Sequence, residues 1–418
     1  MNAALLLAAL LGGDATPLPA GAPAPAISEL GKGYGPAAAA LKGEALRREV
    51  VLAIDRGRDW LIANQNQDGG FGTHHTARGW EILASVPGSL EAFHVATSAL
   101  CVMALDQCVR PTAESAAAAS RGLDYLLANH DVKRQNGMEF YNTWALGYGL
   151  QALGEWGLAH PDDARLPAIK AACRKLLDRL PSYQILDGGF SYLDFDLQSI
   201  PPSDSEMTFT TATVLIGVER AERLGEKAPE GLVKKAVERL AAGQTPEGSF
   251  LYGRYLWQNP RRGINEPKGS ACRTPGNLYA LEAFGRKPNH KVAWSEAVDN
   301  LVNRYVGFQQ IAVRRPVPHE SWYSISGYFY LYGFYYAALV LDEKLPIEQQ
   351  RDYFPSLARG VLYCRQPDGS FWDYPLYNYH YHYGTAYSLL ALSRAPDGWL
   401  DAPATPAAVA APATAGGS

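Results

Sequence analysis

Two kinds of helical pattern alternate along the middle of the chain. Amphipathic segments such as DRGRDWLIANQ (55–65) and LVKKAVERLAAGQ (232–244) place their apolar residues on one helical face. Between them lie segments such as HVATSALCVMAL (94–105) and YGTAYSLLALS (383–393), which are apolar on every side. A helix that is apolar all round must be buried on all sides, whereas an amphipathic helix buries one face. The alternation therefore predicts an all-α protein with inner and outer helices.

Each kind of segment occurs six times between residues 48 and 395. The spacing of about 50 to 65 residues fits one helical hairpin with a long loop, and a repeat of this kind indicates a closed or stacked array. We expect a single (α/α)6 toroid, with six inner helices forming a barrel inside six outer ones. The flanking segments are predicted to be a signal-peptide-like or disordered N-terminus (1–26), a linker or first helix (27–47) and a disordered Ala/Pro-rich tail (396–418).

A turn of one kind recurs between outer and inner helices. It reads QNQDGGF (65–71), QILDGGF (184–190), QTPEGSF (244–250) and RQPDGSF (365–371). Asp-Gly or Glu-Gly suits a tight reversal, because glycine adopts positive φ at little cost. The motif resembles the Gln-Trp (QW) repeat of the terpene cyclase and protein prenyltransferase superfamily, as in squalene–hopene cyclases. The likeness is distant, because Phe replaces the usual Trp and Gln366 in the last turn stands one place closer to Asp368.

The resemblance implies chemistry whose motifs the chain lacks. Cyclases of this superfamily protonate an alkene with an Asp-x-Asp-Asp motif that leads into an inner helix, and the third inner helix has Met207 to Thr210 there. The family's zinc site needs an Asp-x-Cys pair at the mouth of the barrel, but Asp106 and Cys108 end the first inner helix. We therefore expect no metal and no other cofactor. Displaced acids stand in a long loop, where Asp194 and Asp196 are the candidate catalytic residues.

The predicted mouth of the barrel is rich in residues that could contact a ligand. All six inner helices should begin at one rim, and ring closure should bring His94 close to His380 or His382. Aromatic faces and an arginine at this rim could hold an apolar ligand with an anionic group. The predicted ligand-binding residues are His94, Arg273, Tyr328, Tyr332, Tyr335, Tyr381 and His382.

Composition narrows the possible partners. The 418 residues are 47% hydrophobic and 19% charged, with a formal net charge of −4, which gives no reason to expect a nucleic-acid partner. No apolar run reaches the ~20 residues of a membrane-spanning helix. The apolar run after Met1, followed by small residues, favours export to the periplasm or cell envelope over a cytoplasmic location. Neither substrate nor oligomeric state can be predicted.

Three functions remain open at this point. The first is a terpene-cyclase-like or prenyltransferase-like protein that binds or processes an isoprenoid in an aromatic central cavity. The second is a non-catalytic, exported binding or interaction protein on the same scaffold. The third is a toroidal polysaccharide lyase that uses Arg273 beside a rim histidine or carboxylate. Whether the protein is an enzyme is not decided by its sequence, because fold does not fix chemistry.

Overall fold

The computed structural model describes residues 35–73, 87–192, 206–254, 258, 263–289, 293–305, 319–320, 325–326, 329–374 and 379–401. The chain divides into two compact units, Met1–Leu30 and Gly31–Ser418. All the described residues belong to the second unit.

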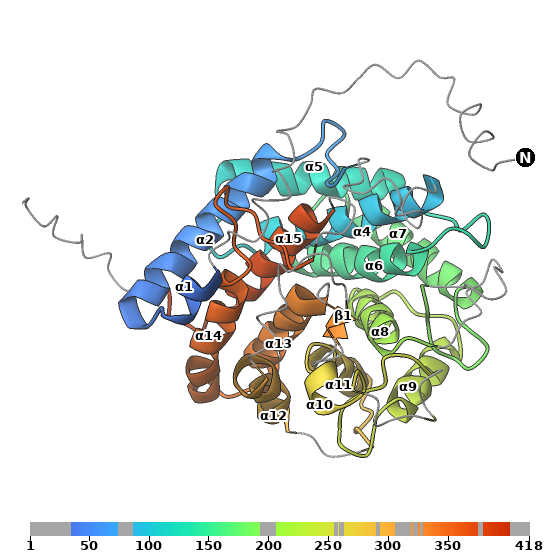
Figure 1. Cartoon of the computed structure of the whole chain (residues 1–418). Coiled ribbons are helices and arrows are strands. Elements are labelled where there is room, and N and C mark those ends of the chain that lie inside the picture. The colour runs from blue at the N-terminus through green and yellow to red at the C-terminus, as the bar shows by residue number, and fades with distance from the viewer. Residues whose placement is uncertain are drawn as a thin grey trace, which may run out of the picture. The chain divides into compact units, whose positions relative to one another are not determined.

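Six inner helices form a closed ring in this unit. Each contacts the next one along the chain, and the last, α15, contacts the first, α4. In Figure 1 they occupy the centre of the unit. They are α4 (Pro87–Asp106), α6 (Asn142–Ala159), α8 (Thr208–Arg223), α11 (Thr274–Ala283), α13 (Tyr330–Lys344) and α15 (His380–Leu392). The structure confirms the predicted all-α toroid.

The outer helices surround this ring (Figure 1). They are α2 (Gly43–Ala63), α5 (Ala113–Asn129), α7 (Leu166–Arg179), α9 (Leu232–Ala242), α12 (Trp294–Asp299) and α14 (Ile347–Leu362), and a π-helical turn, η4 (Asn300–Arg304), continues α12. Outer and inner helices pair as hairpins one to six, from α2 with α4 to α14 with α15. The shorter elements are α1 (Gly35–Ala39), η2 (Leu180–Ser182), α10 (Pro267–Ser270) and a two-stranded antiparallel ribbon of β1 (His319–Glu320) and β2 (Ile325–Ser326).

Burial follows the sequence pattern. In α13 every residue from Tyr330 to Leu341 is buried, whereas α9 buries Leu232, Ala236, Val237 and Leu240 on one face. Small residues let the inner helices approach closely. A Cβ atom on Gly217 of α8 would lie 2.5 Å from the carbonyl oxygen of Gly147 of α6, which is closer than a side chain tolerates.

The recurring turn ties each hairpin to the next outer helix. In hairpin three the side-chain amide of Gln184 donates to the carbonyl oxygens of Gly188 at 2.7 Å and of Leu232, the first residue of α9, at 3.0 Å. Gly188 has φ +100°, and a Cβ atom there would lie 2.9 Å from Lys235 of α9. The amide of Phe190 donates to Thr211 Oγ1 of α8 at 3.0 Å. One turn thus links its own inner helix to the neighbouring outer helix.

The last turn makes the corresponding contact across the closing seam of the ring. Arg365 pairs with Phe371 as Gln184 pairs with Phe190, so Arg365, not Gln366, stands in the place of the repeated glutamine. Its guanidinium lies 3.0 Å from Glu49 of α2, the outer helix of hairpin one. The shift of Gln366 noted in the sequence is therefore a substitution of Arg for Gln at an unchanged register.

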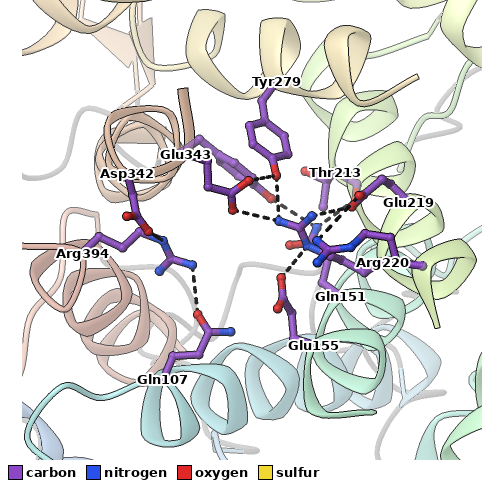
Figure 2. A network of polar contacts seen from close by, with 12 residues as sticks. Gln107, Gln151, Glu155, Thr213, Glu219, Arg220, Tyr279, Asp342, Glu343 and Arg394 are labelled. Atoms are coloured by element: carbon purple, nitrogen blue, oxygen red, sulfur yellow. Dashed lines mark hydrogen bonds and ion pairs between the residues drawn. The ribbon is translucent and has the colours of Figure 1, made fainter. Parts of the chain in front are cut away.

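A polar network closes the end of the barrel where the inner helices finish (Figure 2). Arg220 of α8 lies at its centre, 3% exposed, and forms ion pairs with Glu155, Glu219 and Glu343. Its Nη2 donates to the hydroxyl of Tyr279 at 2.8 Å. These partners come from α6, α8, α11 and α13, so one side chain links four hairpins.

The remaining two hairpins join this network through Arg394, just after α15. Its Nη2 donates to Gln107 Oε1, just after α4, at 3.0 Å, and its Nε lies 3.8 Å from Asp342 Oδ2 of α13 (Figure 2). Basic side chains here also face the negative ends of the inner-helix dipoles. The network occupies this end of the barrel, so the opposite end is the place to look for a site.

Packing reaches slightly beyond residues 48–395. Ala38 of α1 is fully buried, α1 contacts α14, and the ring of Trp399 lies 4.8 Å from that of Phe354 on α14. We therefore propose that the folded ring includes residues 35–401.

The length and apolar composition of the first inner helix bear on whether the chain has a membrane-spanning segment. Among the described residues, Gly88–Asp106 is long and apolar enough to cross a membrane by length and composition alone. However, 89% of this window is buried inside the protein, where it forms the first inner helix. Its apolar character is accounted for by burial in the ring.

The turn contacts predict that alanine substitutions at two glycines with similar φ angles will differ in their effect on stability. Gly188 and Gly225 both have φ near +100°, but a Cβ atom meets Lys235 only at Gly188 and meets nothing within 4 Å at Gly225. Both alanine variants should pay the left-handed backbone cost of ~1–2 kcal/mol. Gly188→Ala should lose at least ~1 kcal/mol more, measured by denaturant unfolding. Equal losses would contradict the role given to this turn.

Candidate functional site

The site is built at the rim where the six inner helices begin. The long connections from outer to inner helices lie at this end, and four of them carry the recurring turn. Aromatic residues stand at or just before the first turn of the inner helices. The rim therefore collects aromatic rings from different hairpins.

The first half of an aromatic arc joins hairpins six, one, two and three. Phe93 of α4 stacks on Tyr379 with ring centroids 4.9 Å apart, and its other neighbour is Tyr141 at 4.3 Å. Tyr141, which precedes α6, in turn stacks on Tyr192 at 5.8 Å and 18°. Contacts of this geometry contribute ~0.5–1.5 kcal/mol beyond simple burial.

The second half continues through hairpins two to five. Trp144 of α6 lies 5.9 Å from Tyr192 and 5.6 Å from Phe209 of α8. Phe209 also contacts Tyr252 at 5.5 Å and Phe329 at 4.5 Å. Within the arc, Trp144 and Tyr192 are half-buried, whereas the other members are buried. Among the members of the arc, these two rings therefore keep the most accessible surface.

A layer of tyrosines fills the middle of the barrel below the arc. The hydroxyls of Tyr148 (α6) and Tyr387 (α15) form a hydrogen bond, and Gln151 Nε2 of α6 lies 3.3 Å from the hydroxyl of Tyr336 on α13. These pairs connect helices that are not neighbours in the ring. Side chains from opposite walls of the ring thus meet in this layer, and Gln151 also belongs to the network of Figure 2.

The tyrosines of this layer are neutral. Burial raises the pKa of Tyr148, Tyr332, Tyr336 and Tyr387 well above the ordinary value for a phenol. Their hydroxyls therefore remain protonated at physiological pH and act as hydrogen-bond donors and acceptors without charge.

The predicted ligand-binding tyrosines separate into different environments. Tyr332 and Tyr335 of α13 lie in or beside the tyrosine layer, with ring centroids 6.3 Å and 5.7 Å from that of Tyr387. Tyr381 lies instead at the outer seam between hairpins six and one, where its ring is 6.3 Å from that of Trp60 on α2. Tyr328 and the candidate acids Asp194 and Asp196 lie outside the described residues.

The two predicted histidines approach the seam from different sides. His94 is buried and packs edge-on against Tyr379, the residue before His380, at 5.3 Å. His382 Nε2 lies 3.2 Å from the carbonyl oxygen of Asn64 at the end of α2. Ring closure thus places both histidines at the seam, although no direct contact between their rings is among the described contacts.

His382 is uncharged in this environment. Burial lowers its pKa to about 4, because a buried imidazolium loses its hydration. A neutral histidine bound to a backbone carbonyl does not attract an anion. Across the described residues, no group of three or more His, Cys, Asp or Glu side chains is placed to hold a metal ion.

Arg273, predicted to bind an anionic group, holds backbone instead. It is fully buried, and its guanidinium donates to the carbonyl oxygens of Ile264 at 2.7 Å, Gly269 at 3.0 Å and Phe250 at 3.3 Å. Its charge lies 5.4 Å from the centre of the Tyr252 ring. It also lies 6.0 Å from the centre of the Phe329 ring, so Arg273 organises the rim connection of hairpin four and polarises two rings of the arc.

Two buried acids lie near the rim, and of these the sequence analysis missed Asp373. Asp373 is fully buried, and its two oxygens accept backbone N–H groups of Leu331 at 2.8 Å and Tyr374 at 2.7 Å, so it caps the start of α13. Burial raises its pKa to about 7. Aligning the turns would have revealed it, because Asp373 stands two residues after Phe371, as Tyr192 and Tyr252 follow Phe190 and Phe250.

Glu206, the second of these acids, lies just before α8 and faces the outer layer. Its Oε2 is 3.4 Å from Arg239 Nε on α9, and a Cβ atom on Gly189 would collide with its side chain. Burial raises its pKa to about 7, while the nearby Arg239 lowers it and Asp187 raises it further. This acid therefore lies between hairpins three and four, behind the arc.

Known proteins resemble the chain only in part, and no protein-family model matches it. A squalene–hopene cyclase of Bradyrhizobium diazoefficiens is 31% identical over 219 residues, which are 49% of this chain and 30% of the cyclase. A probable squalene–hopene cyclase of Sinorhizobium fredii is 30% identical over 225 residues, 50% of this chain and 32% of that protein. The chain is a distant relative of the squalene–hopene cyclases. It spans less than a third of the length of these two proteins.

Solved structures share the fold. The α-1,6-mannanase GH76A of Salegentibacter has a TM-score of 0.50 at 9% identity, covering 82% of this chain and 98% of the mannanase. A possible GH105 family member from Klebsiella pneumoniae has a TM-score of 0.50 at 11% identity, covering 85% and 94%. The type II terpene cyclase MstE from Scytonema aligns at 16% identity with a TM-score of 0.46, over 83% and 99% of the two chains. The two structures with a TM-score of 0.50 support the shared α/α toroid alone, because their identities are so low.

The raised pKa of Glu206 predicts how stability changes with pH. Its folded pKa of about 7 lies above the ordinary 4.5, so its contribution is complete below the ordinary value and is lost as pH rises through 7. The free energy of unfolding should therefore fall between pH 5 and pH 8. Glu206→Gln should make this fall smaller by about 2 kcal/mol. In this variant the free energy of unfolding should still fall with rising pH, because the pKa of Asp373 is also raised.

The matched control is Glu238→Gln, an exposed glutamate on α9 that precedes Arg239 in the sequence. Denaturant unfolding at several pH values should give this variant the pH dependence of the wild type. An identical pH dependence for Glu206→Gln would show that Glu206 is ionised throughout the range and that its burial does not control its charge.

Proposed function

We propose that this terpene-cyclase-like toroid binds an isoprenoid, or a similarly extended unsaturated molecule, on the aromatic arc of its rim. The observation that carries the proposal is the continuity of the arc, which passes from Tyr379 through all six hairpins to Phe329 and leaves Trp144 and Tyr192 half-buried. The distant relationship to squalene–hopene cyclases supports the same ligand class, since squalene is an isoprenoid.

The chemistry of the arc suits an uncharged hydrocarbon chain. Aromatic faces offer dispersion contacts and a negative quadrupole surface, which complement alkene groups and methyl branches. Arg273, which lies beside the arc, is held by three backbone carbonyls. The tyrosine layer below the arc, with Tyr148 bonded to Tyr387, supports a ligand position in the upper half of the barrel.

Catalysis needs an acid that the described inner-helix starts do not supply. Where the family's acids would stand, the third inner helix has Met207 to Thr210. Glu206 faces Arg239 of the outer layer, and both oxygens of Asp373 accept backbone N–H groups. A protonation mechanism would therefore use Asp194 or Asp196 as the acid.

The same contacts distinguish between the two alternative functions. A non-catalytic, exported binding protein on this scaffold needs the arc and no acid, so it remains the second candidate. A polysaccharide lyase would need Arg273 for its substrate, but that guanidinium is fully buried and bound to carbonyl oxygens. The arrangement of Arg273 therefore disfavours the lyase.

Removal of one half-buried ring tests the binding proposal. Trp144→Ala should weaken binding of geranylgeraniol about tenfold, measured by isothermal titration calorimetry, because the ligand loses one stacking face. Trp60→Ala removes an equally half-buried indole from the outer seam and should leave affinity unchanged. The proposal fails if the wild type does not bind, or if both variants bind as tightly as the wild type.

Processing is tested separately from binding. Asp194→Asn combined with Asp196→Asn should leave geranylgeraniol affinity unchanged and abolish any cyclised product that the wild type forms, detected by gas chromatography. Product that survives the double substitution would exclude these acids. If the wild type binds geranylgeraniol and forms no product from it, the non-catalytic alternative is favoured.

A further inference from the structure

We propose that the hydrogen-bonded pair of Tyr148 and Tyr387 forms the floor of the ligand site and sets the longest apolar chain that the site accepts. The pair belongs to the tyrosine layer and joins α6 to α15 inside the barrel. This inference rests on the proposed function and adds to it the residues that determine the length of the ligand.

The floor pair crosses the inside of the ring. Helices α6 and α15 are not neighbours there, because α4 lies between them and contacts both. The hydroxyls of Tyr148 and Tyr387 nevertheless form a hydrogen bond, and the two ring centroids are 6.2 Å apart. The ring of Tyr387 also meets that of Tyr332 on α13 edge-on, at 6.3 Å. Side chains of three inner helices thus obstruct the barrel within one layer.

The rings of the arc lead to this floor from two sides. The half-buried Trp144 stacks on Tyr148, with centroids 5.7 Å apart and 9° between the ring planes. On the other side Phe209 lies 6.3 Å from Tyr332, which contacts Tyr387. Tyr148 follows Trp144 by four residues, a rise of ~6 Å along the helix. A chain that follows the arc into the barrel therefore meets the floor after about one helical turn.

The surface that a ligand could touch ends just below the floor. On α15, Tyr383 is 8% exposed and Tyr387, one turn deeper, is 6% exposed. On α6, Tyr148 is 3% exposed and Gln151, the next residue that faces inward, is 1% exposed. Tyr336, which lies 3.3 Å from Gln151, has no exposed surface. Accessible surface on the inward-facing side chains thus decreases with depth and disappears at Gln151 and Tyr336.

The polarity of the barrel changes at the same depth. Burial raises the pKa of Tyr148 and Tyr387, so the floor is uncharged and offers aromatic rings to a hydrocarbon. Below it, Gln151 Nε2 donates to the carbonyl oxygen of Thr213 at 2.9 Å. A hydrocarbon chain that passed the floor would separate these buried polar groups without replacing their hydrogen bonds, which is costly. The floor therefore limits the ligand by shape and by polarity.

A series of prenyl alcohols that differ by one isoprene unit tests this floor. Alcohols from geraniol through geranylgeraniol to solanesol would displace the fluorescent apolar probe phenylnaphthylamine. For the wild type we expect affinity to rise with chain length and then to stop rising. Tyr387→Ala should bind the first alcohol beyond this limit at least about tenfold more tightly than the wild type does, because the missing ring leaves room for one more unit.

Three variants separate the floor from a general effect on the fold. Tyr387→Leu removes less volume, so it should fold more readily than Tyr387→Ala and extend the length limit in the same direction. Tyr387→Phe keeps the ring and should keep the wild-type limit. Tyr125→Ala is the matched control, since it removes an equal ring from the outer helix α5, where a Cβ atom on Gly70 would lie 2.9 Å from it. This control should lower the melting temperature and leave the limit unchanged.

The possible results distinguish the floor from the binding function. An unchanged limit in the alanine and leucine variants of Tyr387 would overturn the floor and leave the binding function standing. So would a wild-type affinity that rises with every added unit, or an extended limit in Tyr125→Ala, which would come from a looser ring. Failure of the wild type to bind any of the alcohols would overturn both proposals.

Discussion

The contact of the last inner helix with the first is the constraint on which the rest of the structure depends. An inner helix such as α13 is buried on every side, so it needs a neighbour on each flank as well as an outer helix behind it. An open row of six such helices would leave two apolar flanks in water. Packing of α15 against α4 and α2 covers both flanks at once, although the contacting segments are nearly 290 residues apart in sequence.

Stability of the ring is supplied largely away from the rim. The turn residues Gln65 and Gln184 attach their hairpins to the next outer helix, and Arg365 does so across the seam. At the far end Arg220 connects four inner helices through ion pairs and a tyrosine hydroxyl. Because these contacts lie behind and below the barrel interior, the side chains at the start of the inner helices can vary without opening the ring.

The fold could be predicted from the sequence because the same local patterns recur along the chain. Apolar periodicity gave the two helix classes, and Asp-Gly turns gave their order. Individual side-chain contacts were harder to predict, since they depend on the direction in which each side chain points. Arg273 was expected at a ligand but is bound to the carbonyl of Ile264, and His382 was expected in the barrel mouth but lies at Asn64. Neighbouring residues of one helix start, Tyr381 and Tyr379, face opposite sides of the inner ring.

The acids illustrate the same limit and lead to a general point about this repeat. Asp373 has no motif around it, and only its position relative to Phe371 relates it to Tyr192 and Tyr252. At that one position the repeats carry Thr73, two tyrosines or an acid, while the glycine two places before each turn aromatic keeps its backbone role with φ between +83° and +100°. What stays constant between hairpins holds the ring together. What differs between them is the side chain that reaches the start of the preceding inner helix, which is a tyrosine in hairpins three and four and an acid in hairpin six. Ligand chemistry in a toroid of this kind is therefore to be sought in the departures from the repeat, on hairpins three and four.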